Sequence, residues 1–147
     1  MPEPGADARD HDHGRDAFQT FKYAVLRVVP RVERGERVNV GVVLFCRELG
    51  FLDARLEVDE RRLLALAPDL DLAAVRRHLD FVRLVCAGDP ACGYVAGLPQ
   101  DERFTWLASP ASTIVQPSRV HTGRCADPAR ALDRLLDDLV RLGGGGK

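Results

Sequence analysis

Two segments of the chain are apolar at almost every position, and both predict strands that are buried on two faces. In residues 18–29 the odd and even positions are largely apolar alike, and Pro30, which lacks a ladder donor, ends the segment. Residues 38–46 repeat this pattern. Residues 52–58 instead alternate apolar and charged side chains, which indicates a half-exposed strand after a turn at residues 48–50. The three strands predict an antiparallel meander.

Helices are predicted after this meander, because apolar residues then recur at intervals of three and four positions. Asp59 and Asp71 are expected to cap two of them. Asp127-Pro128 is typical of a third helix start, since proline at the first helical position loses no hydrogen bond. Residues 102–108 are predicted to form a short helix or a turn.

Two short strands are predicted near the end of the chain, at residues 113–115 and 119–121, and we expect them to form a hairpin. Together these elements predict a single α+β domain over residues 17–142. Its antiparallel sheet of three to five strands, a β-meander plus the later short hairpin, would be packed by about three helices.

The two ends of the chain are predicted to lie outside this domain. Residues 1–16 contain no large apolar side chain except the initiating methionine, and we expect a disordered tail. Residues 143–147 predict a flexible glycine-rich tail. His11 and His13 would chelate a metal only weakly, because the first tail supplies no fixed third ligand.

The composition is that of a globular protein, with 46% hydrophobic and 29% charged residues. No apolar run is long enough for a membrane helix, and the first residues lack the apolar core of a secretory signal, so we expect a cytoplasmic protein. The cysteines are then expected to be reduced, and their spacing matches no common zinc or redox motif. They are Cys46, Cys86, Cys92 and Cys125. We expect neither a metal nor another cofactor.

The net charge of −1 predicts no strong attraction of the whole chain to nucleic acid or to a membrane. Only Lys22 and Lys147 among the 21 basic residues are lysines, a bias typical of GC-rich genomes such as those of actinobacteria. The arginines of residues 31–37 and Arg27 suit a phosphate group, but two glutamates interrupt them, which favours a solvated turn.

Two groups of polar residues are candidates for a functional site. One lies where the second strand begins, and Gly41 there leaves room for another backbone or a ligand to approach closely. The other follows residue 102. The candidate cluster consists of Arg27, Glu36, Asn39, Gly41, Arg103, Trp106, Gln116, Ser118 and His121.

Two interpretations of this cluster remain open. In the structural one, Glu36 pairs with an arginine, Arg27 or another, and Asn39 bonds to a neighbouring loop. In the catalytic one, Glu36, Asn39 and His121 meet in a cleft as acid, orienting group and base. The structural one is favoured, because signatures of nucleotide-binding loops, serine hydrolases and zinc proteases are absent. His78, on the polar margin of its helix, is predicted at the surface.

Residues 23–30 and 34–45 resemble the opening of the bacterial domain-of-unknown-function 3037 family. Residues 103–107 and 112–123, followed by the Asp-Pro pair at 127, resemble its second half. The resemblance extends from Tyr23 to Val140. One position differs, because Ala111 stands where the family often has an arginine. If that arginine binds a ligand, this chain is expected to bind the ligand less well.

The resemblance implies no activity, but it implies a genomic neighbour, because genes of this family often lie next to a gene for a HipA-like kinase. We therefore expect a non-catalytic interaction or accessory protein that binds such a kinase. One alternative is an enzyme that acts on a nucleotide or another phosphate-bearing substrate. The other is a nucleic-acid-binding module, which requires a continuous basic face rather than arginines dispersed among carboxylates.

Overall fold

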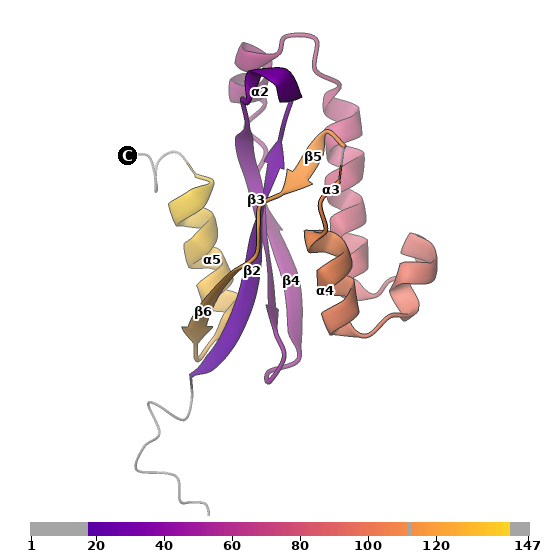
Figure 1. Cartoon of the computed structure of the whole chain (residues 1–147), viewed down its shortest axis with the longest axis vertical. Helices are drawn as coiled ribbons and strands as arrows, with labels where there is room; N and C mark the ends of the chain where they lie inside the picture. Colours follow the sequence, from indigo (N-terminus) through magenta and orange to yellow (C-terminus); the bar gives the residue numbers. More distant parts are fainter. Residues whose placement is uncertain (1–17, 112, 142–147) are drawn as a thin grey trace, which may run out of the picture.

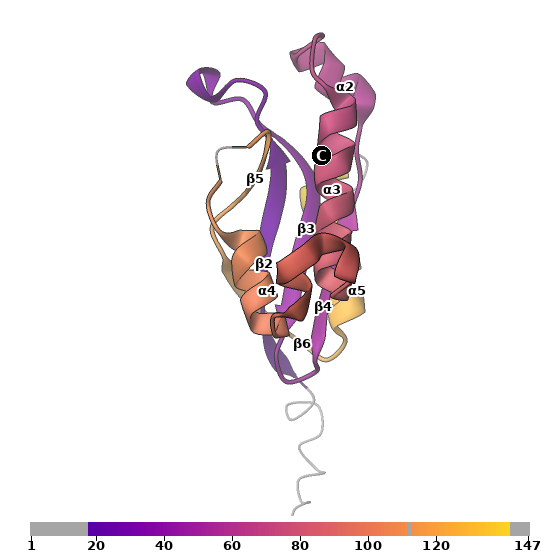
Figure 2. The same cartoon turned by 90° about the vertical axis from the view of Figure 1, so that its right-hand side faces the viewer.

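The sheet of this protein lies between helices on both of its faces (Figure 1). The structure is a computed structural model that describes residues 18–111 and 113–141. One helix, α5 (Pro128–Leu139), covers one face, and α3 (Leu72–Ala87) and α4 (Gln100–Ala108) cover the other (Figure 2). The predicted α+β class with an antiparallel sheet is therefore confirmed. The two predicted tails, residues 1–16 and 143–147, lie outside the described residues.

The predicted meander forms the centre of the sheet. Strand β2 (Gln19–Val28) pairs with β3 (Val38–Cys46), and β3 pairs with β4 (Phe51–Leu56), each antiparallel. The bounds of β3 are those predicted from its continuous apolar pattern. Because helices cover both faces of β2 and β3, the two strands have few exposed side chains.

The predicted late hairpin is wrong. Strands β5 (Val115–Pro117) and β6 (His121–Cys125) both pair with β2 and lie one after the other along its free edge. The link between them continues in the same direction, because the N–H of Ser118 donates to the carbonyl of Val25 at 2.7 Å. The Ser118 hydroxyl accepts from the Val25 N–H at 2.8 Å. The Ser118 side chain thus replaces one backbone hydrogen bond of the ladder with β2. The link between β5 and β6 therefore does not form the turn of a hairpin.

A bulge in β3 exchanges the two faces of that strand. Leu26 pairs with Gly41 and Arg27 pairs with Asn39, so Val40 has no direct partner on β2. Val38 and Val40 therefore belong to the same core as the odd-numbered Val43, beneath α3 and α4. The even-numbered residues beyond the bulge, such as Leu44, pack beneath α5 instead. The strict alternation expected from the sequence holds only on each side of the bulge.

The helices begin where aspartates satisfy their first free N–H groups. Asp59, Asp71 and Asp127 each accept a hydrogen bond from a backbone N–H three residues later, which confirms the predicted caps of α2 (Glu60–Leu66), α3 and α5. Residues 100–108 form the helix α4, which the sequence left open as helix or turn. Two 3-10 segments, η2 (Val32–Arg34) and η3 (Pro90–Gly97), complete the described elements.

Asn39 joins the start of β3 to the end of α5. Its side-chain amide donates to the carbonyl of Leu139 at 2.9 Å, across 100 positions of sequence. The last carbonyls of a helix have no partner inside the helix, so the bond satisfies one of them. The partner of Asn39 is thus a helix terminus.

Gly41 lies in close contact with β4. A Cβ atom at this position would come within 2.9 Å of the backbone carbonyl of Arg55 and 2.5 Å of Leu56 Cδ2. The space that the sequence predicted for a backbone or a ligand is therefore taken by a backbone.

We predict that Gly41→Ala lowers the free energy of unfolding by about 1–3 kcal/mol, because the added methyl group collides with backbone that cannot move freely. Urea unfolding followed by circular dichroism measures the change. Gly97→Ala is the matched control, because nothing lies within 4 Å of the added atom there. Equal stability losses in the two variants would contradict the packing argument.

We predict that Asn39→Ala lowers the free energy of unfolding by about 1 kcal/mol, the usual contribution of one such hydrogen bond. Thermal melts of the wild type and the variant provide the measurement. An unchanged melting temperature would mean that the Asn39–Leu139 bond contributes nothing to the fold.

Candidate functional site

A row of three polar side chains crosses the sheet on the face that α5 covers in part. Arg27 on β2 lies opposite Asn39 on β3 and, on its other side, opposite Gln116 on β5. Side chains that face each other in neighbouring strands lie on the same side of a sheet. The structure thus brings together three of the residues that the sequence selected.

Arg27 is the least satisfied member of this row. Its Nε atom is buried and has no hydrogen-bond partner among the residues that the structure describes. Desolvation and, to a smaller extent, the positive charge of Arg37 lower the pKa of Arg27. Within residues 18–111 and 113–141, neither guanidinium forms an ion pair with a carboxylate. Two close cations that have no carboxylate partner within the described residues are arranged as an anion site would be.

Glu36 and His121 lie away from this row. Glu36 pairs with Arg34 at 2.9 Å in the turn between β2 and β3. His121 lies opposite Tyr23, with the two rings stacked at 5.2 Å. Tyr23 is four positions from Arg27 along β2, which corresponds to about 13 Å. The register therefore does not bring Glu36, Asn39 and His121 together as acid, orienting group and base.

Arg103 has a structural role at the end of α3. Its guanidinium donates to the carbonyls of Val85, Cys86 and Leu98 at 2.8–2.9 Å. It thereby satisfies carbonyls that the helix leaves free and fastens α4 to α3. Neighbouring Gly88 ends α3 in the left-handed conformation, with φ of 67°.

A mainly apolar pocket of about 320 Å³ opens between α3, α4 and the chain that leads into β5. Phe81 and Trp106 pack against each other beside it, with ring centroids 5.6 Å apart. Trp106 is 46% exposed, which is unusual for a side chain of this size. The lining consists of Leu26, His78, Phe81, Val82, Trp106, Leu107, Ser109, Pro110, Ala111, Thr113, Val115 and Pro117.

His78 contributes the one imidazole of this pocket. The sequence predicted His78 at the surface, but the side chain is half-buried in the pocket lining. Burial lowers the pKa of His78, so its neutral form prevails near pH 7. The pocket therefore presents apolar surface with a few uncharged polar groups, a composition typical of binding pockets.

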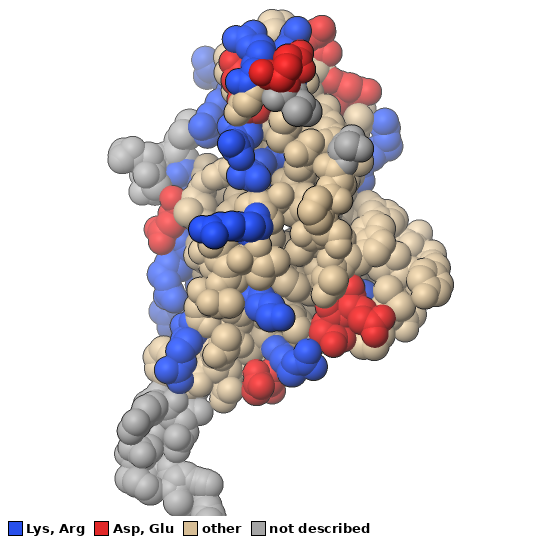
Figure 3. Space-filling view, in the orientation of Figure 1, with Lys and Arg blue, Asp and Glu red and all other residues tan. Residues whose placement is uncertain are grey.

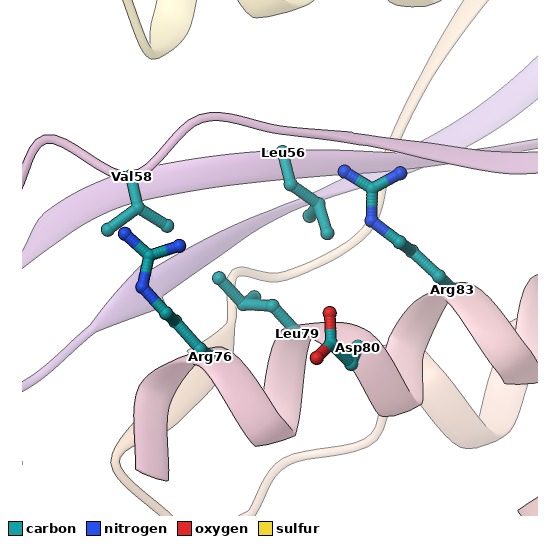
Figure 4. Close-up of a pocket in the computed structure, with 6 residues that line it drawn as sticks. All are labelled: Leu56, Val58, Arg76, Leu79, Asp80 and Arg83. Carbon is teal, nitrogen blue, oxygen red and sulfur yellow. The ribbon is translucent and has the colours of Figure 1, made fainter. Parts of the chain in front are cut away.

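A second cavity, of about 150 Å³, lies between α3 and the chain at the end of β4 (Figure 4). Arg76 and Arg83 extend from the helix toward the strand on either side of Leu79. Arg76 is engaged with Glu60. The cavity is small, and the aliphatic parts of its arginine side chains cover apolar residues beside the edge strand β4. We therefore interpret the cavity as a feature of packing and not as a binding site.

The cysteines lie in the core rather than at either pocket. All four are free and buried. Burial raises the pKa of the Cys86 thiol to about 12, so almost none of it is in the reactive thiolate form at neutral pH. Within the described ranges, no three His, Cys, Asp or Glu side chains are grouped as metal ligands would be.

The fold and these two sites define an α+β domain with an apolar pocket and a polar row across the sheet that includes Arg27. The chain matches the family model described as "Protein of unknown function (DUF3037)" over residues 23–140, and it belongs to this family. No curated protein and no solved structure matches the chain. None of the helices within residues 18–111 and 113–141 has the length and apolar character needed to cross a membrane.

We predict that His78 makes the protein less stable in acid. Its pKa is lower in the folded state than the usual value of about 6.5, so the unfolded chain binds more protons and stability falls as the pH drops below about 6.5. Melting temperatures of the wild type and His78→Gln between about pH 7.5 and about pH 5 measure this effect. The variant should lose less stability over this interval, whereas parallel curves would refute the assignment.

Proposed function

We propose that this protein is a non-catalytic binding protein, and that the pocket beside Trp106 is its docking site for a protein partner. The observation that carries the proposal is the exposed Trp106 ring at the edge of an apolar pocket. Large aromatic side chains next to a pocket are the groups that contribute most to the affinity of protein interfaces.

The lining of the pocket favours a protein side chain over a polar metabolite. Its walls are mainly apolar, and the polar groups among them, His78, Ser109 and Thr113, are few. None of the lining side chains carries a full charge at neutral pH that could hold a phosphate or a carboxylate. An apolar anchor of a partner is therefore the best match to this surface.

The partner that we propose is a HipA-like kinase encoded beside the gene for this protein. The support is membership of the family, since the resemblance to it implies a neighbouring gene for such a kinase, together with the apolar pocket beside Trp106. Binding would place the chain as an accessory or neutralising subunit of the kinase.

An enzyme acting on a nucleotide or another phosphate-bearing substrate has less support. Of its proposed catalytic residues, Glu36 lies in the turn between β2 and β3, and Asn39 and His121 lie opposite different positions of β2, Arg27 and Tyr23. Asn39 is also engaged with Leu139 and is not free to orient a substrate.

Co-expression with the HipA-like kinase of the same genome, followed by size exclusion, tests the proposed function. The wild-type chain should coelute with the kinase, and Trp106→Ala should weaken the complex about tenfold or more, because it removes an aromatic contact. Tyr94→Ala is the control, since this ring is 84% exposed on η3 and does not line the pocket. Separate peaks for the wild-type chain and the kinase would rule the complex out.

A further inference from the structure

A small polar surface lies near the end of α5, on the sheet face that this helix covers in part. Asn39 faces α5, because its side-chain amide donates to the carbonyl of Leu139 at 2.9 Å. Arg27 lies directly opposite Asn39 on β3 and opposite Gln116 on β5, so these three side chains share one face. We call this surface, formed by Arg27, Arg37, Asn39 and Gln116, the arginine site.

Arg37 is the second cation of the arginine site. It lies two positions before Asn39, which makes it a diagonal neighbour of Arg27 on the same face, at a spacing of about 7–8 Å between the two residues. The positive charge of Arg37 helps to lower the pKa of Arg27, as expected for two guanidinium groups this close. In Figure 3, seen as in Figure 1, basic side chains occupy the surface between α5 and β5, whereas the acidic side chains lie mainly at the ends and margins of this view.

The guanidinium of Arg27 is buried on its inner edge. The Nε atom there has no hydrogen-bond partner among the described residues, and the Nη atoms form no hydrogen bond with any of these residues either. The residue as a whole is nevertheless half-exposed. The outer edge of the guanidinium is therefore the part that a ligand can contact, and an anion bound there would compensate a cation that burial has partly desolvated.

No carboxylate of the described residues neutralises the arginine site. Within the described ranges neither Arg27 nor Arg37 forms an ion pair with an aspartate or a glutamate. Two glutamates follow the neighbouring segments of chain, Glu36 in the turn before β3 and Glu57 after β4. Each of them is engaged with another arginine, at 2.9 Å and 3.2 Å.

We propose that the arginine site binds a phosphate group. Guanidinium groups present planar sets of N–H donors that match the oxygens of carboxylates and phosphates. A carboxylate has one charge and two oxygens, which a single arginine satisfies. A phosphate group carries a charge of about −1.5 to −2 at neutral pH and has three free oxygens, so it matches two arginines. Free phosphate and the phosphate of a nucleotide share this chemistry.

The arginine site and the Trp106 pocket lie on opposite faces of the sheet. Leu26 and Val115 line the pocket, and the residue after each of them in its strand, Arg27 or Gln116, faces the other way. The proposal therefore does not depend on the proposed kinase partner. A chain that fails to bind the kinase can still bind phosphate, and the reverse also holds.

A nuclear magnetic resonance titration of the isotope-labelled full chain with inorganic phosphate tests the proposal. Sodium chloride keeps the ionic strength constant at about pH 7.5, where phosphate is mainly the dianion. The amide signals of Arg27, Arg37 and Asn39 should shift and saturate, with half-saturation at about 10 mM phosphate or below. Acetate, the carboxylate probe, should need at least about tenfold more. Shifts that do not saturate, or equal half-saturation by acetate, would overturn the proposal.

Two further probes distinguish free phosphate from a nucleotide as the source of the phosphate group. If adenosine monophosphate half-saturates the site at least about tenfold below inorganic phosphate, the site takes nucleotides. Equal values for the two probes assign it to the phosphate group alone. Adenosine, which has no phosphate, should cause no saturable shift at Arg27 or Arg37. Adenosine binding as tight as that of the monophosphate would show that the phosphate is not recognised.

Single substitutions separate the arginine site from a general effect of charge. Arg27→Gln and Arg37→Gln should each weaken phosphate binding about tenfold, because each removes charge-assisted hydrogen bonds. Arg61→Gln on α2 is the control, since it changes the net charge equally at an exposed position and should leave the affinity within about twofold. Equal losses in Arg37→Gln and Arg61→Gln would overturn the assignment. If Arg27→Gln does not fold, the exposed Arg37 alone provides the comparison.

Discussion

The fold depends on one constraint, which is that β2 and β3 are covered by helices on both of their faces. A polar side chain at the centre of either strand is shielded from water. Polar groups on these strands must therefore form hydrogen bonds within the protein or lie at a strand end. Asn39 satisfies this condition through the terminus of α5, and Ser118 does so through the free edge of β2. Arg27 lies at the end of β2, where its buried Nε atom has no hydrogen-bond partner among the described residues.

The sequence predicted best those features of the fold that depend on neighbouring residues. The bounds of β3 follow from its unbroken apolar run, and the starts of α2, α3 and α5 follow from three capping aspartates. Each of these features needs only a few neighbouring residues, so a single sequence contains enough information to place them.

The sequence predicted less well what depends on distant contacts. The bulge at Val40 is invisible in the sequence, because both faces of β3 are apolar and an exchange of faces leaves the pattern unchanged. The late hairpin was wrong because Ser118 bonds to β2 rather than ending a turn. Likewise, the pocket of His78 and Trp106 forms only when α3, α4 and the chain before β5 meet.

The interrupted edge made by β5 and β6 has a further consequence for how copies of this chain meet. A long, uninterrupted strand edge is a template to which a second molecule can add its own strand. Here the edge consists of two short pieces, broken at Ser118 and flanked by arginines of like charge. Two such edges repel each other and offer no continuous ladder, so this edge of the sheet is a poor template for strand addition.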